Sequence, residues 1–181
     1  TLEQAQESKY QRIIEKLNIK SSDKVLEIGC GWGGFAEYAA KKTGAKITAI
    51  TISKEQLVYS SERIKNSELG DSVEIKLQDY RDVKGTFDKI VSIEMLEAVG
   101  ESYWPTYFNT VSSLLGVQGS ALVQVITVPD EYFDFYRSGT DFIQKYIFPG
   151  GMLICPNSID ILSKKAGLNL TDAYYFVQSY A

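Results

Sequence analysis

The sequence predicts an α/β fold with a doubly wound, mostly parallel sheet of seven strands and helices on both of its faces. Three observations support this prediction. Short apolar runs alternate with amphipathic runs, glycines cluster directly after the first apolar run, and the elements follow the order strand, turn, helix, strand. In such sheets the ligand lies at the carboxyl ends of the strands, where the strand order reverses. We therefore expect the functional residues to follow the predicted strands.

The first half of the chain alternates between helix-like and strand-like runs. From Leu2 to Leu17 apolar residues recur at helical spacing, which predicts an amphipathic helix. Ser53 directly follows a strand-like run and is typical of a helix N-cap. The elements predicted here are a helix over Leu2–Leu17, a strand over Lys24–Ile28, a helix from about Phe35 to Lys42, a strand over Lys46–Ile52, a helix over Lys54–Lys65 and a strand over Val73–Leu77.

The second half continues the alternation but contains one segment that interrupts it. Residues 129–156 stand where a plain α/β fold would proceed to its last strands, and we interpret them as an insert within a single domain that spans residues 1–181. Its aromatic residues are Tyr132, Phe133, Phe135, Tyr136, Phe142, Tyr146 and Phe148. The other elements predicted here are strands over Phe87–Ile93 and Ala121–Thr127, a helix over Tyr103–Leu115, and two final strands over Leu168–Ala173 and Tyr174–Tyr180.

Composition excludes several classes of function. With 19 Lys and Arg against 23 Asp and Glu the chain has no basic surplus, which argues against nucleic acid as a partner. The absence of histidine excludes a Ser-His-Asp catalytic triad, a Cys-His catalytic dyad and a histidine-ligated zinc site. Cys30 and Cys155 are too few for a disulfide framework or a thiolate cluster, so we predict no metal and expect a cytoplasmic protein. The start at Thr1 indicates a piece of a longer protein.

The glycine cluster is the first candidate site. Gly29, Gly31 and Gly33 follow the first predicted strand, where glycine lets the backbone turn sharply and approach a ligand. A tight turn without a ligand is the simpler alternative for glycines alone. Glu27, however, lies inside the strand, where an acidic residue is costly unless it serves a ligand or a backbone network. The spacing also differs from the G-x-G-x-x-G of pyrophosphate-binding turns.

Glu27 and these glycines resemble the first motif of the class I S-adenosylmethionine methyltransferases, which have a Rossmann-like sheet. That motif is an acidic residue and an apolar residue followed by Gly-x-Gly-x-Gly. The resemblance implies that Gly29, Gly31 and Gly33 face the methionine part of the cofactor and that Glu27 supports the loop.

The ends of the next two strands are expected to hold the rest of the cofactor. Most of these enzymes end the second strand in an acidic residue that binds the ribose. Here Thr51 and Gln56 supply a hydroxyl and an amide instead. By the resemblance, Gln78, Asp79 and Tyr80 are placed for the adenine, with Asp79 accepting from its exocyclic amine. A role as a turn or cap residue is the alternative for Asp79.

Four stretches together resemble the cyclopropane-fatty-acyl-phospholipid synthases, relatives of the mycolic-acid methyltransferases, and the likeness covers nearly the whole chain. They are GCGWGG at Gly29–Gly34, TISKEQ at Thr51–Gln56, LQDYRDV at Leu77–Val83 and KYIFPG at Lys145–Gly150. The resemblance implies methylation of a cis double bond in an unsaturated membrane phospholipid, after which the carbocation loses a proton to close a ring. It also implies peripheral contact with the inner membrane face, and leaves the oligomeric state open, a homodimer included.

The resemblance also implies a bound bicarbonate ion that acts as the base. By the resemblance, Glu97 matches the glutamate of that pocket, Ile126 a backbone contact and Tyr180 its tyrosine. Gln124 and Ala98 stand where the family commonly has histidines. A glutamine amide can donate to bicarbonate but cannot take up a proton, which keeps an anion site open and disfavours a protein-borne base. The alternatives are a solvent-exposed helix-start residue for Glu97 and a packed aromatic for Tyr180.

The product and the substrate channel are less sharply specified. The runs Ser92–Gly100 and Asp141–Met152 resemble a subgroup that includes plant-type cyclopropane synthases and enzymes making methyl-branched fatty acids. Glu94 stands where many members have glycine, close in sequence to either ligand. The aromatic segment Tyr132–Phe148 suits a wall around an acyl chain and a passing cation, with ordinary core packing as the alternative.

Two other functions stay open at this point. A small-molecule N- or C-methyltransferase would share the glycine turn, although a small amine needs no aromatic insert. A cofactor-binding module without catalysis is the third possibility, and the presence of Glu97 and Tyr180 argues against it. The family's aromatic-rich segment ahead of the first helix, and its usual continuation after the tyrosine motif, are both expected to lie outside this sequence.

Overall fold

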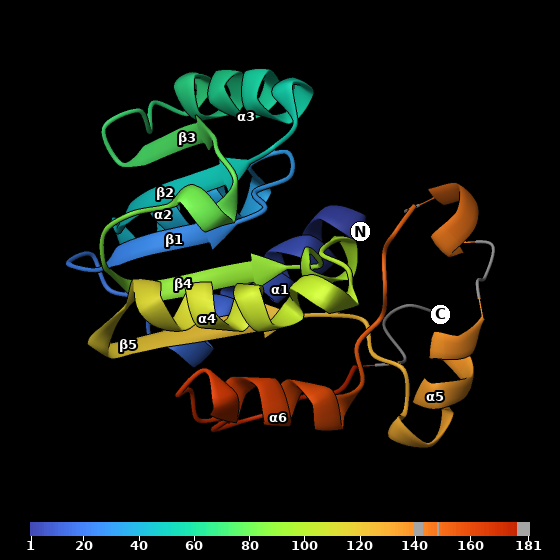
Figure 1. Ribbon diagram of the computed structural model, residues 1–181. Helices are drawn as coiled ribbons and strands as arrows, with labels where there is room; N and C mark the ends of the chain where they lie inside the picture. Colours follow the sequence, from blue (N-terminus) through green and yellow to red (C-terminus); the bar gives the residue numbers. More distant parts are fainter. Residues whose placement is uncertain (140–142, 148, 177–181) are drawn as a thin grey trace.

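The computed structural model describes residues 1–139, 143–147 and 149–176, and a parallel sheet lies at its centre. Within these residues the strands are β1 (Lys24–Ile28), β2 (Lys46–Thr51), β3 (Val73–Leu77), β4 (Phe87–Ile93) and β5 (Leu115–Gln124). Their order in the sheet is β3-β2-β1-β4-β5. The order therefore reverses between β1 and β4, and Figure 1 shows both strands ending on the side of the molecule where α5 lies.

Helices cover both faces of the sheet. They are α1 (Leu2–Leu17), α2 (Gly34–Thr43), α3 (Lys54–Asn66), α4 (Trp104–Leu114), α5 (Asp130–Ser138) and α6 (Pro156–Lys165), with short turns η1 (Tyr80–Asp82), η2 (Leu96–Ala98), η3 (Glu101–Tyr103) and the π-helix η4 (Ile143–Ile147). Neighbouring residues of β1 point to opposite faces, so Val25 packs in the cluster of α1, α2 and α3, and Leu26 in that of α4 and α6. No described helix has the length and apolar character needed to cross a bilayer.

The α/β class and the parallel sheet are confirmed, but the prediction of seven strands is wrong for the described residues, which form five. Residues 168–176 contain no strand, and the rest of the second predicted strand lies outside the described residues. This segment runs beside α1 instead. Asp172 accepts from Lys16 at 2.6 Å, and the Tyr174 ring lies 3.5 Å from the Arg12 guanidinium carbon. Aromatic residues favour a strand, but a strand also needs a neighbouring strand with which its backbone can form hydrogen bonds.

The fifth strand starts earlier than predicted. The predicted strand runs from Ala121 to Thr127, whereas β5 begins at Leu115 and ends at Gln124. Its register with β4 shifts between Phe87 and Lys89, opposite the glycine-containing stretch that looked like a loop. Glycine in a strand often marks such an irregularity.

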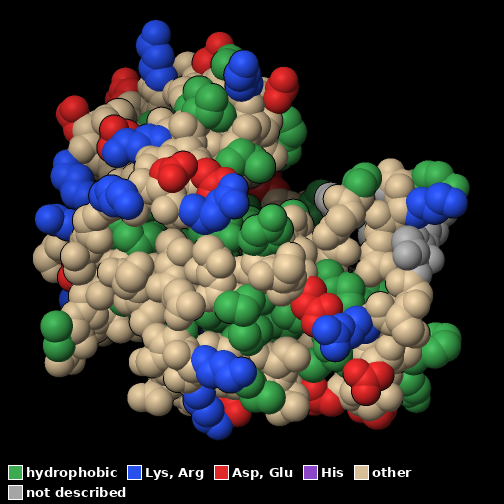
Figure 2. Space-filling model, in the orientation of Figure 1, with side chains coloured by type: hydrophobic (Ala, Val, Ile, Leu, Met, Phe, Trp, Pro, Cys, Tyr) green, Lys and Arg blue, Asp and Glu red, His purple; other side chains and the backbone are tan. Residues whose placement is uncertain are grey.

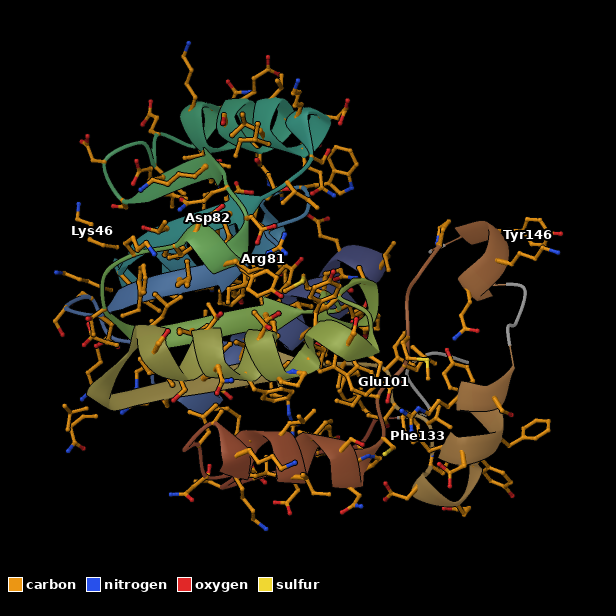
Figure 3. All side chains as sticks on the ribbon, viewed as in Figure 1. Lys46, Arg81, Asp82, Glu101, Phe133 and Tyr146 are labelled. Atoms are coloured by element: carbon orange, nitrogen blue, oxygen red, sulfur yellow. The ribbon has the colours of Figure 1, made fainter. Side chains whose placement is uncertain are left out.

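Both ends of the predicted insert are fixed at the edge of the sheet. Thr127 forms a parallel bridge with Ile154, and the Val128 N–H donates to the Ile154 carbonyl at 3.0 Å. Between these points α5 and η4 stand away from the sheet, and we call them the outer arm (Figure 1). Phe133 points from α5 toward the body of the molecule, whereas Tyr146 points outward (Figure 3). Figure 2 shows a notch between the body and the arm.

Glu37 connects α2 to α3. Its carboxylate accepts hydrogen bonds from Lys41 on its own helix and from Arg63 and Ser67. Burial alone would raise the pKa of Glu37, but these three donors outweigh burial and lower the pKa to about 2. The carboxylate is therefore more favourable in the folded state than in the unfolded chain.

The substitution Glu37→Gln is expected to lower the free energy of unfolding by about 1–2 kcal/mol near neutral pH, with the partial exposure of Arg63 limiting the loss. Because the folded-state pKa lies below the unfolded value, this contribution is complete above the unfolded pKa and disappears as pH falls toward the folded one. Urea unfolding of both proteins at about pH 7 and about pH 3 measures it. The exposed Glu62→Gln is the control, and equal losses at both pH values would contradict the prediction.

Candidate active site

The glycine turn, residues Gly29–Gly34, connects β1 to α2. The N–H groups of Gly29 and Cys30 both donate to the Ile50 carbonyl, at 3.1 and 2.9 Å, which ties the turn to β2. Gly29, Gly31 and Gly33 have φ values of 83°, 52° and 78°, a region that favours glycine. A Cβ built on Gly31 would meet no atom within 4 Å, whereas one on Gly29 or Gly33 would collide with a side chain. The turn is therefore open on the side of Gly31.

Glu27 lies beneath this turn and is only 2% exposed. Burial raises the pKa of its carboxyl well above the ordinary value, and a hydrogen bond from the backbone of Ala36 opposes the rise. Its Oε2 atom has no hydrogen-bond donor among the described residues. Burial together with the charge of Glu27 also raises the pKa of the Cys30 thiol to about 12, so this cysteine stays protonated. A buried acceptor at a strand end is a group that a ligand can satisfy.

Tyr10 is a residue of this site that we did not predict. Its ring packs edge-on against Phe35, with centroids 5.8 Å apart, and a Cβ built on Gly34 would lie 2.7 Å from its hydroxyl oxygen. Burial raises the pKa of Tyr10, and the charges of Glu27 and Glu94 raise it further. In the sequence Tyr10 belongs to the apolar stripe of a helix, so its spacing gave no sign that its hydroxyl reaches the turn.

The residues predicted for the ribose meet at the end of β2. The Thr51 hydroxyl donates to Gln56 Oε1 at 2.6 Å and accepts from the Ser53 N–H at 3.1 Å. Thr51 is thus buried and engaged, and it fixes the orientation of the Gln56 amide. The amide nitrogen of Gln56 donates to no acceptor among the described residues, so this group is the one that a ligand could use.

The predicted adenine residues occupy the end of β3. The Gln78 N–H donates to the Thr51 carbonyl at 2.9 Å, and the Tyr80 ring lies 5.7 Å from that of Tyr107. Asp79 caps η1 through the Arg81 N–H and pairs with the Arg81 guanidinium at 2.7 Å. This pairing lowers the pKa of Asp79. The geometry matches the cap role that we had kept as the alternative for Asp79.

A second cluster, the acidic edge, follows β4 and β5 and comprises Glu94, Glu97, Gln124 and Ile126. The Ile126 N–H donates to Glu97 Oε1 at 2.7 Å, and the Gln124 amide Nε2 donates to Glu94 Oε1 at 2.7 Å. Burial raises the pKa of Glu97, the Ile126 N–H opposes the rise, and the charge of Glu94 adds to it. Tyr180 lies outside the described residues, so its predicted place beside Glu97 stays a prediction.

The glycine turn and the acidic edge are neighbours because β1 and β4 are adjacent in the sheet. Met95 connects them, since it packs against Gly29 and immediately precedes η2, which carries Glu97. The residues fit S-adenosylmethionine on two observations: the open side of Gly31 and the buried, unpaired Oε2 of Glu27 among the described residues. We propose Gly29, Gly31, Gly33, Glu27 and Gln56 as the groups that hold it.

Comparison with known proteins identifies what this chain resembles. A protein-family profile described as "Mycolic acid cyclopropane synthetase" matches residues 1–181. The chain is 40% identical to the tuberculostearic acid methyltransferase UfaA1 of Mycobacterium tuberculosis over 178 residues, which is 98% of this chain and 42% of that protein. It is 42% identical to the cyclopropane-fatty-acyl-phospholipid synthase of Escherichia coli K12 over 152 residues, 84% of this chain and 38% of that protein.

Solved structures give the same answer. The crystal structure of the mycolic acid cyclopropane synthase CmaA1, complexed with SAH and CTAB, superposes with a TM-score of 0.86 at 28% identity, over 95% of this chain and 64% of that one. The chain thus spans about two fifths of the length of the curated relatives and under two thirds of this structural neighbour.

Proposed function

Because the chain belongs to the mycolic acid cyclopropane synthetase family, we propose that the full-length protein transfers a one-carbon unit from S-adenosylmethionine to the cis double bond of an unsaturated phospholipid acyl chain. The observation that carries the proposal is the position of Glu97. Its half-buried carboxylate accepts from the Ile126 N–H and belongs to η2, which follows β4, the neighbour of β1 in the sheet. This position supports the proposal, because a one-carbon transfer to a double bond needs a proton-accepting group beside the expected cofactor turn, where the strand order reverses.

The residues act by positioning rather than by activating a nucleophile. When bound, S-adenosylmethionine supplies an electrophilic methyl group. The open side of Gly31 admits its methionine part, and Glu27 offers Oε2 to the ammonium group there. An alkene is a weak nucleophile, so the turn and the acidic edge must hold the reacting carbons in line and exclude water.

The outer arm supports a lipid rather than a small amine as the substrate. Phe133 is buried and packs on Trp104 with ring centroids 6.2 Å apart, which follows the core-packing alternative. Tyr132, Phe135 and Tyr146 are instead 60%, 83% and 60% exposed. Exposed aromatic rings on a projecting arm suit peripheral contact with a membrane surface, where apolar rings settle at the headgroup level.

The test is incubation of the full-length protein with methyl-labelled S-adenosylmethionine and vesicles of unsaturated phospholipid, followed by mass spectrometry of the acyl chains. We expect label to enter the chains as one added carbon, and fragmentation to distinguish a ring from a methylene or methyl branch. Vesicles of saturated phospholipid are the control. Label in small amines with none in lipid would overturn the lipid proposal in favour of a small-molecule methyltransferase, and cofactor binding without any transfer would favour a binding module.

A further inference from the structure

Two of the hydrogen-bond donors expected to hold a bicarbonate ion are bound to carboxylates in this chain. The Ile126 N–H, the expected backbone contact, donates to Glu97 Oε1 at 2.7 Å. The Gln124 amide, which replaces a histidine of the family pattern, donates through Nε2 to Glu94 Oε1 at 2.7 Å. A second contact fixes this pair, because the Glu94 N–H donates to the Gln124 carbonyl at 2.9 Å. Two donors assigned to the anion are thus directed toward acidic side chains of the protein.

The charge of the acidic edge is also unfavourable for an anion. Glu94 and Glu97 are three residues apart at the end of β4, and the charge of Glu94 contributes to the raised pKa of Glu97. A bicarbonate ion here would add a third negative charge to a pair that already repels itself. The same arrangement is favourable for a carbocation. Two neighbouring carboxylates attract a positive charge for the same reason that they repel an anion. The described residues therefore do not fit bicarbonate.

Glu97 has the geometry of a base. Its backbone carbonyl accepts from the Met152 N–H at 2.8 Å, which fixes the main chain, and its Oε1 accepts from the Ile126 N–H, which orients the carboxylate. Its Oε2 is buried and receives no hydrogen bond from the described residues. An oriented carboxylate whose second oxygen is unpaired among the described residues can take a proton without a mediating ion.

We propose that the carboxylate of Glu97 itself takes the proton released from the transferred methyl group, and that the reaction needs no bicarbonate. The inference rests on the proposed function. After methyl transfer the substrate carries a carbocation, a C–H bond of the new methyl group breaks, and Glu97 Oε2 takes the proton. The electron pair of that bond closes the three-membered ring, or forms the double bond of a methylene branch after a hydride shift. A proton on a methyl group beside a carbocation is strongly acidic, so the position of the Glu97 carboxylate matters more than its basicity. Glu94 orients Gln124 and adds negative charge near the cation.

The first test is the bicarbonate dependence of the unmodified full-length protein. Lipid methylation is measured in argon-sparged buffer freed of carbon dioxide, and again with bicarbonate added. We expect equal rates. Activity that is lost on depletion and restored by bicarbonate would overturn the inference while leaving the proposed function intact. Absence of lipid labelling under both conditions would instead mean that the proposed function has failed.

The second test replaces the proposed base. Glu97→Gln is expected to lower kcat by about 100-fold or more, because a positioned general base contributes about that much. The dissociation constant for S-adenosylhomocysteine, measured by calorimetry, is expected to stay unchanged. Glu97→Asp keeps a carboxylate but holds it farther from the transferred methyl group. Proton removal should then become slower, and we expect a larger primary isotope effect on the rate when the cofactor carries a deuterated methyl group. A purely structural role would leave this isotope effect unchanged and thereby overturn the inference. Glu101→Gln, which removes a surface pair with Arg137, is the matched control.

Discussion

Gly29→Ala is expected to abolish cofactor binding and to lower the free energy of unfolding by about 2–4 kcal/mol, through backbone strain and overpacking together. Gly29 has a φ of 83°, which an alanine adopts only with strain. Its new Cβ would lie 2.7 Å from Met95 Cγ and 3.1 Å from Met95 Cβ. The clash involves the root of the Met95 side chain, so rotation of the far end cannot relieve it. Because Met95 immediately precedes η2, the displacement would also reach Glu97.

Two measurements check this expectation: urea unfolding for stability, and calorimetry with S-adenosylhomocysteine for binding. Gly70→Ala is the matched control, since a Cβ on Gly70 meets nothing within 4 Å and its φ lies outside the left-handed region. Binding by Gly29→Ala as tight as by the unmodified protein would show that the turn does not hold the cofactor.

Glu27→Gln is expected to stabilise the cofactor-free protein while weakening cofactor binding. Glu27 is buried with an unpaired Oε2 among the described residues, and its pKa is raised well above the ordinary value. A carboxyl whose folded-state pKa is raised binds its proton more tightly when folded. It therefore costs nothing below the unfolded pKa, and its cost grows as pH rises from there toward the folded pKa. Near neutral pH the amide should gain about 1–3 kcal/mol of stability and lose about tenfold or more in cofactor affinity.

Thermal and urea unfolding across the pH range from about 4 to about 8 measure the first effect, with the exposed Glu7→Gln as control. The difference between Glu27→Gln and the unmodified protein should widen as pH rises. A difference independent of pH would mean that the amide changes packing rather than charge. Calorimetry with S-adenosylhomocysteine near neutral pH measures the second effect, and unchanged affinity would contradict a cofactor role for Glu27.

The parts of the fold that follow from local chemistry were predictable. Val25 and Leu26 of β1 are consecutive apolar residues because both faces of the strand are covered, and the glycines after β1 mark the turn. The start of β5 was not predictable, because its glycines at a register shift resemble a loop. The prediction of two final strands was wrong, because the aromatic pattern of residues 168–176 carries no information about a neighbouring strand. This segment packs on α1 instead, through contacts with Lys16 and Arg12.

The candidate site divides in the same way. The cost of an acidic residue inside a strand pointed to Glu27, and the structure shows that carboxylate buried. The partners of a side chain are set by tertiary geometry, which no spacing records. The sequence shows that Gln124 has an amide to donate, but not that Glu94 accepts from it. It likewise shows neither that Tyr10 reaches the glycine turn nor that Met95 packs on Gly29.

The fixed ends of the outer arm have a consequence for how this fold can diversify. The chain leaves the edge of the sheet at Thr127 and returns at Ile154, where the two residues are bridged and Val128 is bonded to Ile154. The segment between them is therefore a loop whose two ends are held together by backbone contacts. The entropic cost of closing a loop grows only with the logarithm of its length. Adding or removing residues inside this loop therefore changes the free energy of folding little once its ends are fixed. The length and sequence of the arm can thus change while β1, which carries Glu27, and η2, which carries Glu97, keep their places.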